Sequence, residues 1–161
     1  MSKQGFTLVE ILTAVVIVTI LVTMAVPMYE KTIERSRMAE ARTVLNRLQA
    51  AKLTAMDMMG CTTYLSTSAV CPKIKHLGVA FAQGTVAGND YAFETKDFHY
   101  SINPGGSYPK GVCARRLGGD YAGTLFLYNG EQEDVEPLFL CHGAYCEAYG
   151  LESSNAFSAC N

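Results

Sequence analysis

The sequence predicts an α+β protein in which one long N-terminal helix packs on a small antiparallel sheet. Three observations carry this prediction. Segment 11–29 of the 161-residue chain contains no charged residue. Segment 30–59 has neither Gly nor Pro, and its apolar residues recur at helical spacing. Segment 61–161, which we call the head, shows short alternating runs and holds all six cysteines.

The composition excludes one broad class and disfavours another. With 49% hydrophobic and 17% charged residues, the chain is too apolar and too weakly charged to be intrinsically disordered. Its 13 Lys and Arg are outnumbered by 15 Asp and Glu, which disfavours coating of nucleic acid through bulk positive charge.

The apolar segment Phe6–Tyr29 is predicted to be a membrane-spanning helix. As a helix it would extend about 36 Å, enough to cross a hydrocarbon core of about 30 Å with slight tilt. A cleaved secretory signal is the alternative, but such signals have an apolar region of about 7–15 residues and end at a small-residue cleavage site. This run is longer and lacks such a site, so we expect a retained anchor.

Glu10 is the one charged residue within this run. A charge in lipid costs about 2.5–3.5 kcal/mol on insertion scales and usually marks a functional contact. Lys3 is too far along the helix to pair with it directly, whereas cleavage after Gly5 would create a nearby cation, the free α-amino group of Phe6. The alternative is that Glu10 simply reaches the headgroup layer.

This N-terminal sequence resembles the processing site of type IV prepilins and pseudopilins, in the residues Lys3-Gln4-Gly5-Phe6-Thr7-Leu8-Val9-Glu10. The resemblance implies that residues 1–5 are a leader, that a prepilin peptidase cuts between Gly5 and Phe6, and that Phe6 is N-methylated. It also implies that Glu10 pairs with the N-terminal amine of a neighbouring subunit during filament assembly.

The same resemblance places Pro27 where the helix of this family bends, and Pro27 removes one backbone hydrogen bond. Many pilins have a Gly in mid-segment, which is absent here between residues 13 and 26. Thr13, Thr19 and Thr23 hold the polar positions, and we expect their hydroxyls to bond to carbonyls one turn earlier.

Two features favour opposite membrane orientations. Lys31, Arg35 and Arg37 outnumber Lys3, so the positive-inside rule places the C-terminus in the cytoplasm. The six cysteines instead fit an oxidising compartment. Because the resemblance agrees with the cysteines, we expect an inner-membrane protein with its N-terminus inside and C-terminus outside, which later joins an extracellular pilus (fimbrium).

Segments 6–29 and 30–60 are predicted to form one continuous helix that ends at Gly60. Within the second segment Arg37 is spaced to pair with Glu34 and Glu40. A coiled coil is the alternative, but an apolar stripe of about four turns without a strict heptad favours packing on a sheet. The stripe consists of Ile33, Ala41, Val44, Leu45, Leu48, Ala51, Ala55, Met56 and Met59.

The head is predicted to contain four or five antiparallel strands after a loop-like segment 61–90. Turn signals at Lys96-Asp97, Gly118-Gly119 and Asn129-Gly130 separate them. The expected strands are Tyr91–Thr95, Phe98–Ile102, Gly111–Leu117, Thr124–Asn129 and Leu138–Cys141.

The six cysteines are expected to form disulfides, each stabilising the small head by about 2–4 kcal/mol. Sequence alone leaves 15 connectivities open. Proximity along the chain favours a bridge between the first two cysteines. The resemblance to pilins implies a bridge between Cys141 and Cys160 that closes the C-terminal loop. Cys113 and Cys146 are then left to pair with each other. The expected pairs are Cys61–Cys71, Cys141–Cys160 and Cys113–Cys146.

Three other uses of polar residues are disfavoured. Cys141, His142 and Cys146 resemble half of a zinc site, but the second pair is missing. An acidic stretch offers oxygen ligands for Ca²⁺, as in a related secretion pseudopilin, yet its spacing fits no EF-hand and favours a solvated turn. Arg115-Arg116 could contact DNA, as in competence pili, but an ordinary solvent-exposed pair without a ligand is favoured. The calcium candidates are Glu131, Glu133, Asp134 and Glu136.

We therefore predict a structural subunit of a type IV pilus, without cofactor or enzymatic activity. His76, His99 and His142 lie in no recognisable catalytic motif. The expected partners are copies of the chain itself, the prepilin peptidase and methyltransferase, the pilus assembly platform and the inner membrane. Adhesion, twitching motility and secretion are the associated roles. The alternatives are a type II secretion pseudopilin, a minor pilin, or an anchored binding domain that does not polymerise.

Overall fold

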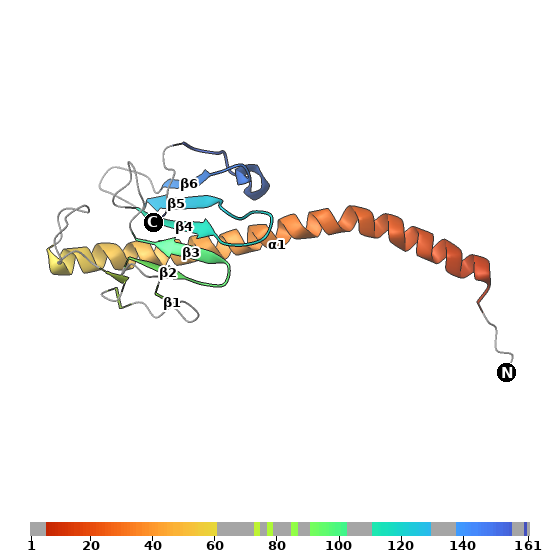
Figure 1. The fold of residues 1–161 in the computed structure, drawn as a ribbon, viewed down its shortest axis with the longest axis horizontal. Coiled ribbons are helices and arrows are strands. Elements are labelled where there is room, and N and C mark those ends of the chain that lie inside the picture. Colours follow the sequence, from red (N-terminus) through yellow and green to blue (C-terminus); the bar gives the residue numbers. More distant parts are fainter. Residues whose placement is uncertain are drawn as a thin grey trace.

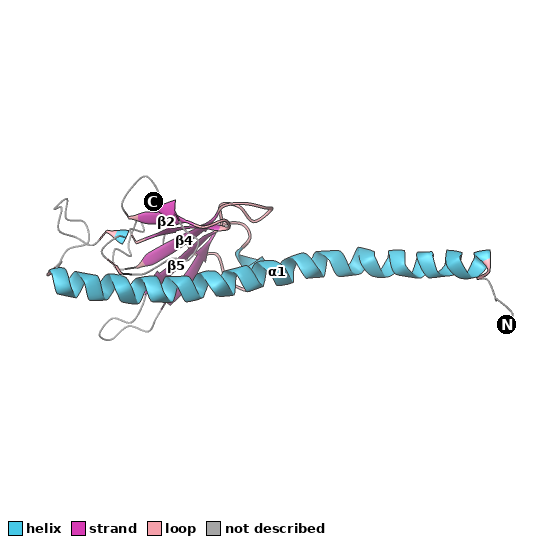
Figure 2. Cartoon of the chain, turned by 90° about the horizontal axis from the view of Figure 1, so that it is seen from below, coloured by secondary structure: helices cyan, strands magenta, loops and turns pink. Residues whose placement is uncertain are grey.

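One helix forms the axis of the molecule and carries a sheet on its C-terminal half, while its N-terminal half projects alone (Figure 1; Figure 2). This confirms the predicted α+β class, with a long helix packed on an antiparallel sheet. The computed structural model describes residues 6–60, 73–74, 77–78, 85–86, 91–102, 111–129, 138–155 and 160.

The helix, α1 (Leu8–Met59), has clear signals at both ends. Thr7 is the N-cap, and its hydroxyl oxygen accepts a hydrogen bond of 3.2 Å from the backbone N–H of Glu10. Gly60 ends the helix in the left-handed conformation, with φ of 66°, which a residue without a side chain adopts without strain. The helix continues through Pro27 without a break, so the two predicted halves are one element.

The threonines in the apolar run bond to their own helix, as the sequence predicts. Thr13 donates to the carbonyl of Val9 at 2.9 Å, and Thr19 donates to that of Val15 at 2.7 Å. Thr23 donates to the carbonyl of the residue three positions earlier at 2.7 Å. Their hydroxyls are therefore satisfied without water, as an apolar environment requires.

The sheet is a six-stranded antiparallel meander in which each strand pairs with the next along the chain. The five predicted strands are confirmed to within about a residue or two, and β1 is an additional short strand in the segment predicted as loop. A 3₁₀ turn, η2 (Cys146–Tyr149), follows the last strand. The strands are β1 (Thr85–Val86), β2 (Ala92–Glu94), β3 (Phe98–Ser101), β4 (Val112–Arg116), β5 (Leu125–Asn129) and β6 (Leu138–His142).

The face of the sheet toward α1 forms the main core. Apolar residues of the predicted helix stripe, such as Leu45 and Leu48, are fully buried against it. Helix-on-sheet packing within the chain is thus observed, although Met59 at the end of the stripe is exposed and does not join the core. The strand residues of this cluster include Phe93, Tyr100, Val112, Ala114, Phe126 and Cys141.

The opposite face of the sheet carries a second, smaller apolar cluster. Alternate residues of the same strands point to it, because successive side chains in a strand point to opposite faces. Cys113 and Leu127 are fully buried there and are joined by Cys160 from the C-terminal end of the chain. The sheet therefore separates two buried clusters.

Lys52 is a buried amine on the core side of α1. Its Nζ donates hydrogen bonds of 2.7 Å to the carbonyl of Ile102 and 2.8 Å to the carbonyl of Gly111. Burial lowers the pKa of Lys52 from 10.5 to about 7. Because the folded pKa lies below the unfolded one, the folded chain binds fewer protons above pH 7 and gains stability as pH rises.

We expect the free energy of unfolding of the full chain in detergent micelles to rise by about 2 kcal/mol between pH 7 and pH 9. Lys52→Met should remove most of this pH dependence, which denaturant unfolding followed by tyrosine circular dichroism would measure. Lys31→Met, at an exposed position of the same helix, should retain it. An unchanged slope in the Lys52 variant would contradict the assignment.

Candidate functional site

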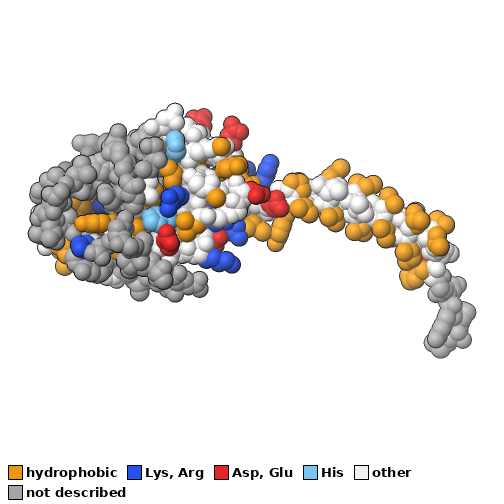
Figure 3. Space-filling model, viewed as in Figure 1, with side chains coloured by type: hydrophobic (Ala, Val, Ile, Leu, Met, Phe, Trp, Pro, Cys, Tyr) orange, Lys and Arg blue, Asp and Glu red, His pale blue; other side chains and the backbone are white. Residues whose placement is uncertain are grey.

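The N-terminal half of α1 is a bare apolar rod. The large apolar side chains between Phe6 and Tyr29 are 48–79% exposed, and they cover the projecting helix in Figure 3. By its length and composition α1 can cross a membrane. Within the described part of the chain, the head begins to bury helix residues only at Glu34. The apolar side chains of this bare stretch (residues 8–33) therefore require lipid or another protein to cover them.

Phe6 precedes the N-cap Thr7 at the free end of this rod, and Glu10 lies in the first turn of α1. Phe6 is 79% exposed. Glu10 is also exposed, and its carboxylate has no hydrogen bond or ion pair with any residue that the structure describes. Gly5 and the predicted leader, residues 1–5, lie outside the described residues. The geometry leaves the Glu10 carboxylate available to a partner from another chain.

A buried ion pair marks the junction between the bare stretch and the head. The carboxylate of Glu34 on α1 accepts hydrogen bonds from the Arg116 guanidinium on β4, from Nε at 3.1 Å and from Nη2 at 3.0 Å. It also accepts one of 3.2 Å from the hydroxyl of Tyr149 in η2. Both charged side chains are nearly inaccessible, with 3% exposure for Arg116 and 8% for Glu34.

More polar groups extend this junction to the β2–β3 turn. Arg37 also pairs with Glu34, as predicted, but its second partner is Asp97 at 3.8 Å. Asp97 also pairs with Arg116 at 3.1 Å. The predicted pair between Arg37 and Glu40 does not appear among the described residues. On the other side, the Nε of Arg35 donates to the backbone carbonyl of Ala148 at 3.1 Å.

The junction keeps its charges under ordinary conditions. Burial alone would raise the pKa of Glu34, but hydrogen bonds from Arg116 and Arg37 hold that pKa below its ordinary value. The pKa of Arg116 is raised, chiefly by its hydrogen bonds to Glu34. Burial and the neighbouring carboxylate raise the pKa of Tyr149, which keeps its hydroxyl as a donor. The ion pair weakens only as acid protonates Glu34.

Arg116 corrects the prediction of a surface arginine pair. Arg115 is exposed, but Arg116 is buried and bonded to Glu34. Residues at even positions of β4 face α1, as Val112 and Ala114 show, so Arg116 points into the core. Only one arginine of the pair faces solvent, and the DNA-binding alternative loses its basic pair. Strand alternation was the signal that could have revealed the buried arginine.

The predicted pairing of four cysteines is wrong. The structure pairs Cys113 with Cys160 and Cys141 with Cys146, at Cα–Cα distances of 5.7 Å and 5.8 Å. Cys113 and Cys160 lie in the smaller cluster, whereas the other two lie in the core against α1. Either predicted bridge would have had to cross the sheet. The predicted bridge between Cys61 and Cys71 lies outside the described residues.

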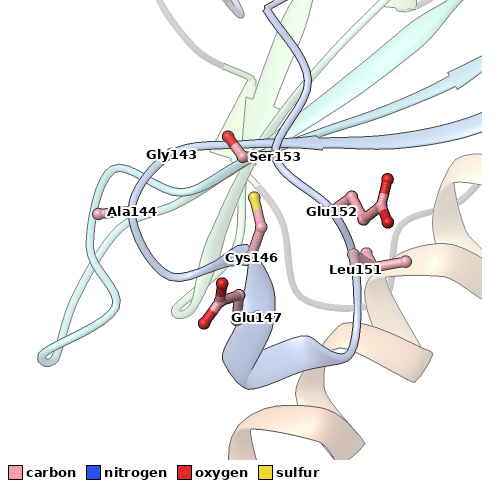
Figure 4. A pocket seen from close by; sticks show the side chains of 7 residues that line it. All are labelled: Gly143, Ala144, Cys146, Glu147, Leu151, Glu152 and Ser153. Atoms are coloured by element: carbon pink, nitrogen blue, oxygen red, sulfur yellow. The ribbon is translucent and has the colours of Figure 1, made fainter.

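A pocket of about 460 Å³ lies beside η2 (Figure 4). Its two carboxylates, Glu147 and Glu152, stand on opposite sides and do not converge on one point. No group of three or more His, Cys, Asp or Glu that could hold a metal occurs in the described part of the chain. The calcium candidates in segment 131–136 lie outside it. The pocket is lined by Gly143, Ala144, Cys146, Glu147, Leu151, Glu152 and Ser153.

The two described histidines are engaged separately. The Nδ1 atom of His99 lies 2.8 Å from a carboxylate oxygen of Glu94 on the neighbouring strand. The Nδ1 atom of His142 lies 2.7 Å from the backbone carbonyl of Ser154. His76 lies outside the described residues. The structure therefore does not bring these two imidazoles together at a shared site.

Comparison with known proteins supports the interpretation of the N-terminus. Residues 1–26 match the family model described as the prokaryotic N-terminal methylation motif, which is the signal motif of type IV pilins and pseudopilins. This match, with the bare apolar helix, supports a membrane-anchored precursor of the type IV pilin-like or pseudopilin class. Neither a curated protein nor a solved structure matches the chain.

We expect Arg116→Ala to lower the free energy of unfolding by about 3–5 kcal/mol, because it leaves the buried Glu34 carboxylate without its main partner. Arg115→Ala, the adjacent exposed arginine, is the matched control and should change it by less than about 0.5 kcal/mol. Denaturant unfolding of the full chain in detergent would measure both. Equal effects of the two substitutions would contradict a structural role for this ion pair.

Proposed function

We propose that this chain is a structural subunit of a type IV pilus. In this proposal the chain is inserted in the inner membrane with its N-terminus inside, cut between Gly5 and Phe6, and N-methylated on Phe6. It is then polymerised by the assembly platform through its N-terminal helix. Its role is structural and requires neither cofactor nor catalysis.

The observation that carries this proposal is an unpaired acid at the free end of a bare apolar helix. Two opposite charges about 4 Å apart attract by about 4 kcal/mol at an effective dielectric of 20. The Glu10 carboxylate therefore gains when the N-terminal amine of a neighbouring subunit approaches it. A simple membrane anchor would gain nothing from a charge in this position, because the charge is costly in lipid.

A type II secretion pseudopilin or a minor pilin is the second candidate, since the methylation motif occurs in both groups. The disulfide-bonded head favours a pilus subunit, because pseudopilins and minor pilins often lack such bonds. An anchored domain that does not polymerise is disfavoured by Glu10. Adhesion, twitching motility and secretion are the roles associated with the proposed polymer.

We expect Glu10→Ala to leave membrane insertion and cleavage intact but to abolish filament formation, because the subunit loses its charged contact. Glu30→Ala, an exposed acid on the same helix beyond the apolar run, should assemble normally. Electron microscopy of sheared surface material would compare the two variants. Normal filaments from the Glu10 variant would contradict the proposed role.

We expect the mature protein to begin at N-methylated Phe6, which intact-protein mass spectrometry of sheared filaments would show. Gly5→Leu should block cleavage, leave the leader attached and prevent assembly, because the peptidase of this family cuts after a glycine. Recovery of wild-type filaments that retain residues 1–5 would contradict the proposed processing.

A further inference from the structure

Among the described residues outside the bare stretch, the large exposed apolar side chains lie at two opposite ends of the head-bearing part of the molecule. Beyond the bare stretch, four large apolar side chains are exposed among the residues that the structure describes: Met58 (82%), Tyr145 (43%), Met59 (37%) and Leu117 (36%). The two methionines lie in the last turn of α1, at the end far from the bare helix. Figure 1 shows that the β2–β3 turn, the β4–β5 turn and η2 lie at the opposite end, nearest the bare helix.

Lys96, Leu117, Tyr121 and Tyr145 come from the β2–β3 turn, the β4–β5 turn and the turn before η2, and we call them together the proximal patch. The backbone N–H of Leu117 donates to the carbonyl of Asp97 at 3.0 Å, which joins the two turns. The rings of Tyr121 and Tyr145 meet edge-to-face at 5.4 Å between centroids. The junction around Glu34 holds this end of the sheet on α1.

The far end of the head presents a patch of complementary chemistry, which we call the distal patch (Asp57, Met58 and Met59). Methionine sulfur makes favourable contacts with aromatic rings, and the proximal patch offers tyrosine rings. The exposed acid Asp57 also matches the exposed cation Lys96. Neither has an ion pair with another described residue, so both charges are available to a second chain.

The spacing of the two patches fits the length of the bare helix. The part of α1 from Glu34 to Met58 is about 36 Å long, and the bare stretch is about 38 Å long. A second copy displaced along the axis by about 36 Å would bring its proximal patch to the distal patch of the first. Its bare stretch would then lie along the outer face of the first copy's head-bearing helix.

That outer face has small residues that permit close approach by a second helix. On the solvent side of α1 opposite the sheet these are Ala39, Thr43, Ala50 and Thr54, with the exposed Arg47 beside them. The hydroxyl of Thr43 donates to the carbonyl of Ala39 at 3.1 Å, and that of Thr54 donates to the carbonyl of Ala50 at 3.0 Å. Both hydroxyls are thus satisfied within the helix. Small interface residues let two helices pack closely.

We infer that the distal patch of one head binds the proximal patch of a second copy of this chain, displaced along the helix axis. The inference rests on the proposed function and assigns its head-to-head contact. Because the two patches differ and lie at opposite ends, the interface is heterologous, and repetition generates an open filament rather than a closed dimer.

A disulfide cross-link tests this contact in the assembled, full-length protein. The variant carrying Met58→Cys and Tyr145→Cys should give a ladder of covalent multimers on non-reducing gels after mild oxidation of filaments. The matched control carries Met58→Cys and Arg115→Cys, because Arg115 is exposed on a strand outside both patches. The control should remain largely monomeric, apart from background that both variants share.

The outcomes separate this contact from polymerisation itself. Filaments without the specific ladder would overturn the contact and leave the proposed pilus intact; the proximal patch would then face another occupant, such as the membrane surface. Absence of wild-type filaments would overturn both proposals. A charge exchange provides a second measurement: Asp57→Lys or Lys96→Asp alone should reduce filament yield severalfold, and the double exchange should restore it. Failure of the double exchange to restore the yield would count against the pairing of these two charges.

Discussion

The ion pair between Glu34 and Arg116 fixes how the head sits on its helix. Glu34 is the first residue of α1 that the head buries, and its carboxylate binds side chains 82 and 115 positions later in the chain. Apolar burial is non-directional and would tolerate rotation or sliding of the sheet along the helix. A bidentate contact between guanidinium and carboxylate requires one register. We attribute orientation to this pair, since a buried ion pair is weak evidence for net stability.

Periodicity was enough to predict α1 and the five strands β2 to β6 to within about a residue or two, but not β1 or η2. The period of α1 and the alternation of the strands are local signals, and the apolar stripe identified the face that packs on the sheet. The junction was missed because it joins residues far apart in the chain. Arg116 is the instructive error. It lies on the same face of β4 as the buried Val112 and Ala114, but a charged pair at the end of a strand favoured a solvent-exposed position.

The disulfides show what chain proximity cannot decide. The pairings depend on which face of the sheet each cysteine occupies, and this follows from strand register. Cys113 lies opposite Leu127, whereas Cys141 lies opposite Phe126, so the two cysteines point to opposite faces. Only after β4, β5 and β6 are placed in register does this become visible. At the N-terminus the reverse holds, because the methylation motif matched by residues 1–26 is local and can be found without any tertiary information.

The bare helix imposes an energetic condition on the proposed assembly. Lipid chains are as apolar as the side chains that cover residues 8–29, so moving this stretch from a bilayer into a bundle of like helices gains little hydrophobic free energy. The preference for the filament must then come from contacts that lipid cannot supply. The Glu10 carboxylate is one, since an amine neutralises it better than hydrocarbon does. Contacts between heads are the other, and they act only if the head is held in a fixed orientation on α1. The junction at Glu34 and the charge at Glu10 lie on opposite sides of the membrane-spanning stretch. In the proposed assembly, both favour the filament over the subunit in the bilayer.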